Sequence, residues 1–290
     1  MSKHMALVRK IIHGLRWPRV RHRLGYGRVW LQSRLFPPSR GKFPPVWLAV
    51  KSVFPPVWKM DDRPHGLLAI GGILTEDALL AAYSKGIHPF CDRHPIQWVV
   101  FNPRMVLFLE KTKIGKGLRP LIRSGQFKVT FDTAFEEVVQ SCSDRSYTWL
   151  VPERIDLAVA LHEQGRVHSV EVWDHKGYLA GGLFGVDMGR IFIGESAFSN
   201  EPNAMKVAFA YLNCHLQHWG YGLHDAQMYS KHLELMGFEE IPRRKYGDRL
   251  RELVDADAHH GKWKVDEHLD VAEWVPSLPG SQVKERVLEQ

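Results

Sequence analysis

The sequence predicts an α/β fold in the broad sense, a mixed α+β arrangement, from three observations. Short apolar runs bounded by Gly or Pro recur along the chain, as in Gly66–Gly72 and Ile191–Ile193. Amphipathic segments of helical period lie between such runs, as in residues 133–142 and 204–219. The composition, 44% hydrophobic and 24% charged, is that of an ordinary globular protein, and no apolar run approaches the ~20 residues of a membrane span.

Charge is distributed unevenly along the 290 residues. Residues 1–60 hold 13 Lys or Arg and no acidic residue, so of the 39 basic and 32 acidic residues the remainder holds 39 − 13 = 26 basic against 32 acidic. We expect residues 1–42 to form a basic arm, disordered or in contact with nucleic acid, because aromatic side chains lie among its arginines. A transit peptide or a membrane-surface helix is an alternative, and the apolar core of a secretory signal peptide is absent.

The first half of the chain reads as a small domain over residues 43–101, followed by the start of a larger one. Phe43-Pro44-Pro45-Val46-Trp47 recurs at residues 54–58, and prolines this dense favour an extended covering segment. Thr75 is a helix cap and Gly86 a helix end. The expected strands are 66–72, 97–101, 105–109 and 127–131, and the expected helices are 78–85 and 117–123.

The second half reads as a three-stranded meander between helices, within a domain over residues 102–253. Helices are expected at 133–142, 153–164, 204–219 and 230–236, and strands at 168–173, 178–186, 190–193 and 222–227. Gly181-Gly182 in the middle strand suggests a bulge or a close approach by a ligand. Residues 241–244 are expected to be a loop, and the polar, aperiodic residues 254–290 a C-terminal tail.

A candidate site follows the strand Ile191–Ile193. The strand is expected to break at Gly194 and to present Glu195 and Ser196, before the turn Asn200–Asn203 starts the next helix. A loop from strand to helix is a common place for functional groups in α/β folds. A helix cap beside a solvated glutamate is the alternative.

Cysteine and histidine usage gives no sign of a disulfide or a metal site. Cys91, Cys142 and Cys214 stand far apart without paired spacing, so a reducing compartment such as the cytoplasm is expected. The pair His259-His260 is expected to be solvated. No metal site is therefore expected.

A second basic cluster lies around the expected helix 117–123. A solvated helix face explains such a cluster, and contact with nucleic-acid phosphates is the other interpretation. Its members are Lys111, Lys113, Lys116, Arg119 and Arg123.

Seven separated motifs follow one another between Phe54 and Leu250. Together, and in this order, they resemble the signature motifs of the leucyl/phenylalanyl-tRNA–protein transferases. The motifs are Phe54-Pro55-Pro56, Gly66-Leu67-Leu68-Ala69-Ile70-Gly71-Gly72, Ala81-Ala82-Tyr83-Ser84-Lys85-Gly86-Ile87-His88-Pro89, Asn102-Pro103-Arg104-Met105-Val106-Leu107, His168-Ser169-Val170-Glu171-Val172-Trp173, Gly194-Glu195-Ser196 and Asp225-Ala226-Gln227.

The resemblance implies a small N-terminal α/β domain followed by a domain with the fold of GCN5-related acetyltransferases (GNAT). It implies transfer of Leu or Phe from aminoacyl-tRNA to the α-amine of a protein whose N-terminal residue is Arg or Lys, which marks that protein for degradation. In the catalytic group that it implies, Gln227 contacts the attacking amine, Asp225 polarises it and Glu195 lies beside the aminoacyl-adenosine. The charged tRNA is a co-substrate, and the resemblance implies no cofactor.

This chain departs from the family pattern in the pocket that holds the transferred side chain. Ala197 stands where the family usually has Met, His224 where it has Ile, and Phe90 where it has Trp. The transferred amino acid is therefore left open. The other residues that the resemblance assigns to this pocket are Trp149, Leu183, Phe192, Phe209 and Leu212.

Two alternatives to transfer onto a protein remain at this point. The enzyme could join an amino acid from tRNA to a small molecule or peptide in a biosynthetic route, or the chain could be a non-catalytic tRNA-binding relative. The retained Glu195, Asp225 and Gln227 argue against the non-catalytic relative, whereas Ala197 and His224 leave the biosynthetic route open.

Overall fold

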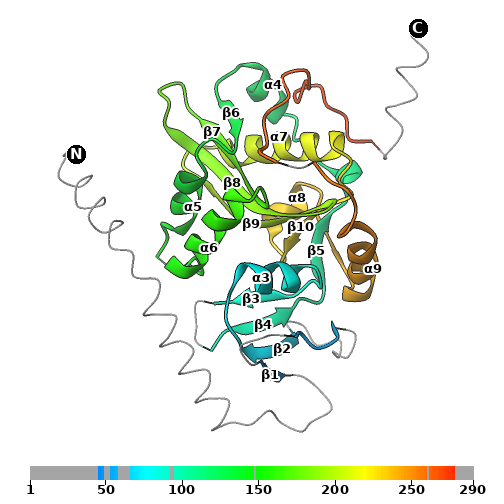
Figure 1. Cartoon of the computed structure of the whole chain (residues 1–290). Helices are drawn as coiled ribbons and strands as arrows, with labels where there is room; N and C mark the ends of the chain where they lie inside the picture. Colours follow the sequence, from blue (N-terminus) through cyan, green and yellow to red (C-terminus); the bar gives the residue numbers. More distant parts are fainter. Residues whose placement is uncertain are drawn as a thin grey trace, which may run out of the picture.

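The structure is a computed structural model that describes residues 45–48, 53–57, 66–91, 95–146, 148–259 and 261–277. The basic arm, residues 1–42, lies outside the described residues, as do residues 278–290. The predicted mixture of strands and helices is confirmed. Strands form one sheet of four and one of seven, and helices pack on and between them (Figure 1).

The smaller sheet is built from residues 46–100. β1 (Val46–Leu48) pairs parallel with β2 (Gly66–Gly71), and β4 (Gln97–Val100) pairs antiparallel with both β2 and β3 (His88–Phe90). Helix α3 (Glu76–Tyr83) begins as expected, because the Thr75 hydroxyl accepts a hydrogen bond from the Ala78 amide at 3.1 Å.

The larger sheet has the order β11-β5-β10-β9-β8-β7-β6. β6 to β9 form an antiparallel meander, β10 lies parallel to β9, and β5 lies antiparallel to both β10 and β11. The strands are β5 (Arg104–Leu107), β6 (Lys128–Phe131), β7 (Val167–Trp173), β8 (Leu179–Met188), β9 (Ile191–Ser199), β10 (Leu223–Gln227) and β11 (Glu239–Ile241).

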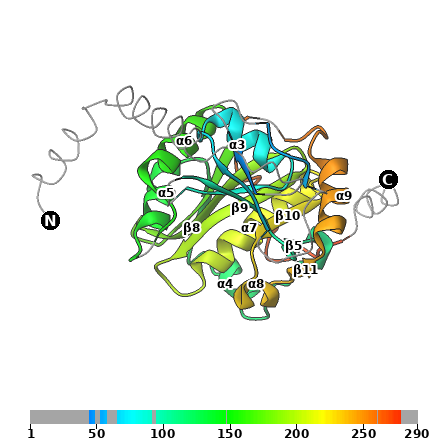
Figure 2. The ribbon, with the colours of Figure 1, turned by 90° about the horizontal axis from the view of Figure 1, so that it is seen from below.

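The two faces of the larger sheet are covered by different helices. Side chains alternate along each strand, so Phe192 packs with α7 (Ala204–His218), while its neighbours Ile191 and Ile193 pack on the other face. That other face is covered by α5 (Phe135–Ser143), α6 (Pro152–Glu163) and α9 (Arg243–Leu253), and α4 (Leu118–Arg123) lies next to α7 (Figure 2).

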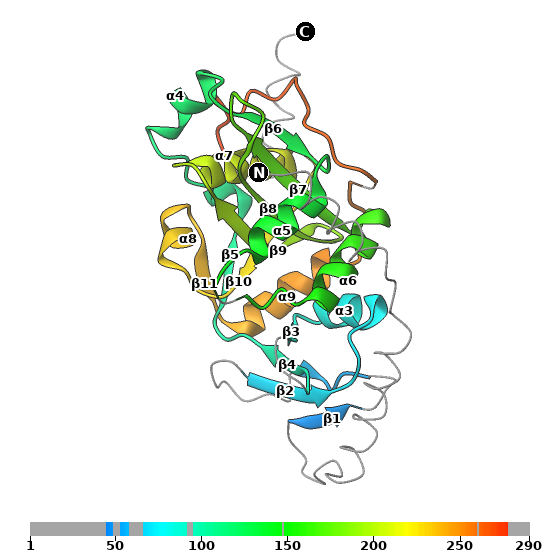
Figure 3. The ribbon, with the colours of Figure 1, turned by 90° about the vertical axis from the view of Figure 1, so that its left-hand side faces the viewer.

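Helices α3, α6 and α9 lie at the level between the two sheets (Figure 3). Each of them contributes buried apolar residues, among them Tyr83 and Tyr246, to one core cluster with Ile191 and Ile193 of β9. The groups that these helices carry therefore meet the ends of β5, β9 and β10. None of the helices in the described part of the chain is both long and apolar enough to cross a bilayer.

Strand β9 does not break at Gly194, as the sequence had suggested, but continues to Ser199. Its register with β8 shifts between Phe184 and Gly185, so the strand accommodates an irregularity and keeps pairing. Its pairing with β10 ends at Asp225 opposite Ile193. Glu195 therefore lies on a strand beside the point where β9 and β10 separate.

The glycine pair in β8 serves packing, and the expected approach by a ligand is not needed to explain it. A Cβ on Gly181 would lie 2.7 Å from the Ala204 Cβ, and one on Gly182 would lie 2.6 Å from the Val170 carbonyl oxygen. Both distances are shorter than carbon and oxygen atoms tolerate without a shift. The glycines therefore let α7 and β7 approach β8 closely.

The helix α9 was not predicted, because residues 241–244 had been interpreted as a loop. Most residues of this helix are charged, including Arg243, Arg244, Lys245, Asp248 and Arg249. The segment therefore has few apolar positions from which a helical period could be recognised. Its buried face is Tyr246, Leu250 and Leu253. Tertiary packing of that narrow face fixes the helix.

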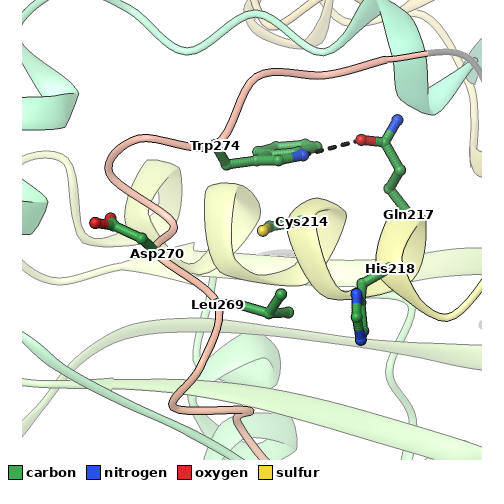
Figure 4. A pocket seen from close by; sticks show the side chains of 6 residues that line it. All are labelled: Cys214, Gln217, His218, Leu269, Asp270 and Trp274. Carbon is green, nitrogen blue, oxygen red and sulfur yellow. Dashed lines mark hydrogen bonds between the residues drawn. The ribbon is translucent and has the colours of Figure 1, made fainter. Parts of the chain in front are cut away.

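Residues 261–277 of the segment expected to be a tail pack against the larger sheet and its helix α7. Trp263 is fully buried, stacks on His168 at 3.9 Å and donates its backbone N–H to Asp132 at 2.7 Å. Farther on, the Trp274 indole N–H donates to the Gln217 side chain of α7 at 2.9 Å (Figure 4). Several aromatic anchors thus compensate for the missing periodicity.

Candidate active site

Asp225 is the centre of a buried charged network at the ends of β5 and β10. Its carboxylate accepts hydrogen bonds from Arg104 Nε at 2.9 Å and Arg104 Nη2 at 2.7 Å, and the two side chains are 0% and 1% exposed. The Tyr246 hydroxyl of α9 donates to the same carboxylate at 2.7 Å. Burial, and then Asp225, raises the pKa of Tyr246 well above its usual value, so this hydroxyl stays a donor.

Gln227 is held in an unusual backbone conformation beside this network. Its φ is +66°, in the left-handed region that favours glycine, and its backbone N–H donates to Asp225 Oδ1 at 2.8 Å. Its side-chain Nε2 donates to the Gly194 carbonyl at 3.0 Å, which fixes the orientation of the amide, because a carbonyl cannot donate. No described residue donates to Gln227 Oε1, so this oxygen can accept a hydrogen bond from a substrate.

Glu195 belongs to a second charged cluster, directly beside the first. Arg154 of α6 pairs with its carboxylate at 2.8 Å, and the Tyr83 hydroxyl of α3 donates to the other oxygen. Burial, and then Glu195, raises the pKa of Tyr83 well above its usual value. Gln227 Nε2 lies 3.4 Å from Glu195 Oε1 and links the two clusters.

Polar groups without a protein partner face the space around Arg154. Its Nε and Nη1 are buried and hydrogen-bonded to nothing in the described chain, as is His88 Nδ1. Burial, then the positive charges of Arg104 and Arg154, lowers the pKa of His88 well below its usual value. Buried polar groups without partners are uncommon, so this place is suited to a ligand with hydrogen-bonding groups.

Aromatic rings surround the same place. The His88 ring lies 5.3 Å from Phe90, 5.6 Å from Phe101 and 5.9 Å from Trp149, and the Arg154 guanidinium lies 5.7 Å from the Trp149 ring. Flat apolar surface combined with unsatisfied donors would fit a planar heterocycle or an aromatic side chain.

The structure divides the expected aminoacyl pocket into two groups on opposite faces of the sheet. Phe90 and Trp149 lie around His88, on the face that carries Glu195, Gln227 and the charged clusters. The other six residues lie on the α7 face in or beside one apolar cluster, and His224 of this group approaches Gly194 of β9. These six are Leu183, Phe192, Ala197, Phe209, Leu212 and His224.

The five cations proposed to bind tRNA have different partners in the structure. Arg119 donates to the Trp274 carbonyl at 2.9 Å and Arg123 to Glu273 at 2.7 Å, so both hold the C-terminal segment on α4. Lys111 pairs with Glu239 at 2.5 Å. Lys113 and Lys116 are exposed, and these two remain proposed phosphate contacts.

The sequence analysis missed four residues that hold the site together: Tyr83, Arg104, Arg154 and Tyr246. Arg104 and Tyr83 do lie inside the recognised motifs, and Arg104 is followed there by the apolar run Met105-Val106-Leu107. A charged residue at the start of a buried strand must be paired, which is the signal that could have identified Arg104. Arg154 and Tyr246 lie in helices whose sequence shows no comparable contrast.

No group of three or more His, Cys, Asp or Glu suited to a metal ion is found among the described residues. Cys91, Cys142 and Cys214 are all buried, and none of them forms a disulfide. The arrangement fixes hydrogen-bond donors and acceptors in place and leaves Gln227 Oε1 and two N–H groups of Arg154 without a partner among the described residues. This is suited to positioning two reactants of which one is already activated.

Comparisons with known proteins point to one family. The family model for leucyl/phenylalanyl-tRNA protein transferase matches residues 106–251. The leucyl/phenylalanyl-tRNA–protein transferase of Nitrosospira multiformis is 43% identical over 225 residues, which cover 76% of this chain and 97% of that protein. The protein of the same name from Pseudomonas syringae pv. syringae is 44% identical over 216 residues, covering 72% and 94%.

Similarity to solved structures is more distant. L-PGS from Bacillus licheniformis aligns with a TM-score of 0.32 and 10% identity, over 63% of this chain and 64% of that one. A tandem GNAT protein from the clavulanic acid biosynthesis pathway aligns with a TM-score of 0.30 and 12% identity, over 59% and 60%.

Proposed function

This chain belongs to the leucyl/phenylalanyl-tRNA–protein transferase family, and we propose that it moves an amino acid from aminoacyl-tRNA to the α-amine of a protein whose N-terminal residue is Arg or Lys. It is an aminoacyltransferase. The proposal concerns its donor, its acceptor and the work of each residue.

The reaction exchanges an ester for an amide. The acceptor amine attacks the carbonyl carbon of the aminoacyl ester, the new C–N bond forms, and the C–O bond to the terminal ribose breaks. The proton that the amine loses ends on the ribose oxygen that leaves, so the atoms balance without a further reactant. An α-amine has a pKa near ~8, so part of it is neutral and nucleophilic at pH 7 without a strong base.

Gln227 is proposed to hold the attacking amine. Its Nε2 is committed to the Gly194 carbonyl and approaches Glu195, which leaves Oε1 to accept an N–H from the amine. An amide oxygen is too weak a base to remove the proton fully, so its contribution is orientation of the nitrogen lone pair towards the ester. Positioning of this kind supplies much of the rate when a substrate is already activated.

Asp225 is proposed as a positioning residue, and Arg154 is proposed both to hold Glu195 and to contact the donor. The Asp225 carboxylate is fully buried and accepts from Arg104, Tyr246 and the Gln227 backbone, so it acts on the amine only through Gln227. Glu195 is held by Arg154 and Tyr83 in the same manner. The free N–H groups of Arg154 and the rings around His88 form the proposed place for the terminal adenosine.

The wider setting is proposed on family grounds. Aminoacyl-tRNA and protein N-termini meet in the cytoplasm, which is the proposed location. The new N-terminal residue would mark the acceptor for degradation. Lys113, Lys116 and the basic arm are the proposed contacts for the tRNA backbone, because each phosphate contact gains from counterion release.

The observation that carries the proposal is the position of the Gln227 side chain. Gln227 has a left-handed backbone conformation, and its Nε2 is bonded to the Gly194 carbonyl and lies near Glu195, so Oε1 remains free to accept a hydrogen bond. The test is transfer from a mixture of charged tRNAs to a peptide with N-terminal Arg, detected as a new amide. Gln227→Ala should lower the rate by roughly 10²-fold, because the amine loses its orientation.

Two controls accompany this test. A peptide whose N-terminal amine is acetylated should accept nothing, and Gln217→Ala, on α7 beside Trp274, should leave transfer within about twofold, because it lies outside the site. Undiminished transfer by Gln227→Ala would remove the proposed role. Discharge of tRNA onto a small amine and never onto the peptide would favour the biosynthetic alternative.

A further inference from the structure

His224 and Asn213 form a buried polar pair in the otherwise apolar cluster on the α7 face. His224 Nδ1 lies 2.9 Å from Asn213 Oδ1, and the residues are 5% and 0% exposed. The imidazole is surrounded by three rings, Phe192 at 5.1 Å, Phe209 at 5.8 Å and Phe238 at 5.2 Å. A polar pair in such surroundings is costly unless its hydrogen bonds are made.

The hydrogen bonds of Asn213 determine which imidazole nitrogen carries the proton. Asn213 Nδ2 donates to the Phe209 carbonyl at 2.7 Å, and a carbonyl can only accept, so the orientation of the amide is fixed. Asn213 Oδ1 is therefore an acceptor, and His224 Nδ1 must donate to it. Burial lowers the pKa of His224 to about 3, so the ring is neutral at physiological pH and Nε2 carries a lone pair.

Nε2 lies at the point where β9 and β10 separate. A Cβ on Gly194 would come within 3.1 Å of Nε2, and the Gly194 carbonyl binds the Gln227 side chain. No described residue donates a hydrogen bond to Nε2. An acceptor is thus presented inside an apolar cluster, next to the backbone that positions the amine-binding glutamine.

We propose that His224 sets the preference for the transferred amino acid. Its Nδ1 is held by Asn213, and its Nε2 accepts a hydrogen bond from the side chain of the amino acid that is transferred. This inference rests on the proposed function and names its donor more closely. The favoured amino acid has an apolar side chain that carries an O–H or N–H group. Leu and Phe have no such group and would leave Nε2 without a partner.

The rest of the cluster supports this assignment. Ala197 is a small residue on the same face and lies opposite Leu183, and Leu183 and Leu212 are buried in the same cluster, so the cluster provides apolar contact around this pair. Glycine at 194 keeps the space in front of Nε2 free, because any Cβ there would crowd the nitrogen. Asn213 acts only through His224 and is a positioning residue.

The experiment compares pairs of amino acids that differ by one hydroxyl. The same tRNA is charged with Tyr or with Phe, and the two charged forms compete for one peptide acceptor with N-terminal Arg. A second competition compares Thr with Val in the same way. The wild type should prefer the hydroxyl member of at least one pair by roughly 5- to 150-fold, the range expected from a buried acceptor left unpaired. His224→Leu should abolish or reverse that preference, and His224→Gln, which keeps an acceptor, should retain part of it.

Asn213→Leu tests the tautomer without touching the substrate. Once Nδ1 has lost its acceptor, the proton can move to Nε2, which then donates, so the preference for the hydroxyl member should fall. A residue needed only for folding would change the yield or the melting temperature and leave the ratio unchanged. Thermal unfolding of each variant confirms that the compared proteins are folded.

A binding measurement separates failure of this inference from failure of the proposed function. Amide-linked 3′-aminoacyl-adenosine analogues of the four amino acids cannot transfer, and their affinities should follow the same order. If the peptide is never modified but the affinities of the analogues still favour the hydroxyl members, the proposed acceptor is wrong and the inference about His224 stands. If the wild type favours neither hydroxyl member, or His224→Leu keeps the wild-type ratio, the inference is overturned.

Discussion

Around Gly194, the two faces of the larger sheet bury different kinds of polar group. On the face covered by α3, α6 and α9, full charges are buried in pairs, Arg104 with Asp225 and Arg154 with Glu195. On the α7 face the group nearest Gly194 is a neutral imidazole, His224, which is held by the Asn213 amide among aromatic rings. On the charged face, hydrogen bonds hold the side chains of Glu195 and Gln227 in defined positions. On the α7 face, His224 Nε2 is left as a hydrogen-bond acceptor for a substrate.

The difference teaches which residues can touch substrate. Asp225 has its oxygens occupied by Arg104, Tyr246 and Gln227, so it is a scaffold for the glutamine beside it. Gln227 Oε1, the free N–H groups of Arg154 and His224 Nε2 have no partner in the described chain. Recognition is therefore expected from these atoms, and the paired charges are expected to govern stability.

The largest expected effect comes from breaking the charged face. Arg104→Met should lower the free energy of unfolding by about 3–5 kcal/mol, because Asp225 would be left as a buried carboxylate without its countercharge. Urea unfolding measures it. The double variant Arg104→Met with Asp225→Leu should recover much of the loss, since no uncompensated charge remains. A single variant within about 1 kcal/mol of the wild type would show that this pair is not the scaffold.

On the α7 face, the buried neutral His224 should make the free energy of unfolding depend on pH. The folded-state pKa of His224, about 3, lies below the unfolded value of 6.5, so its neutral form contributes stability that is present above pH 6.5 and is lost as pH falls towards 3. Between pH 8 and pH 5 this loss amounts to about 2 kcal/mol in the wild type. His224→Leu should lack it, so the two unfolding curves should converge on acidification. Parallel pH profiles would contradict the buried neutral imidazole.

A smaller effect is expected from one hydrogen bond of the Glu195 cluster. Tyr83→Phe removes the hydroxyl that donates to Glu195 but keeps the ring and the Arg154 pair, so the loss should be about 1 kcal/mol. Transfer should fall less than in Gln227→Ala, because Arg154 still holds Glu195. Both quantities are measurable on one preparation, and a loss as large as that of Arg104→Met would mean that Tyr83 is the main support of Glu195.

The smallest effect should come from an exposed ion pair, which serves as the reference for the buried ones. Arg123 and Glu273 are 51% and 60% exposed, so Arg123→Gln should cost less than about 1 kcal/mol, and less still at high salt. The comparison is urea unfolding of Arg123→Gln and Arg104→Met at two salt concentrations. Equal losses for the two variants would contradict the contrast between buried and exposed charge.

Much of the fold could be predicted because local signals agreed with it. Thr75 caps α3, the turn at Asp174–Gly177 joins β7 to β8, and the 204–219 period is the helix α7. The break expected at Gly194 was wrong because glycine is also compatible with a strand whose neighbour, His224, comes close. Glycine is likewise explained at 181 and 182 only once the position of α7 is known.

The sequence by itself determined the fold class, the order of most elements and, through seven motifs in register, the family and the candidates Glu195, Asp225 and Gln227. The fold class and the elements follow from local periodicity, whereas the family and the roles of the three candidates follow from the resemblance of the motifs to a known family. Only the tertiary structure decided which groups are paired and which are free. Arg104 and Asp225 are 121 positions apart, and Tyr83 and Glu195 are 112 apart, so their contacts depend on strand register and helix packing and not on any local pattern. The same is true of Asn213 and His224, which lie on different elements, and whose one hydrogen bond determines where the imidazole presents its lone pair.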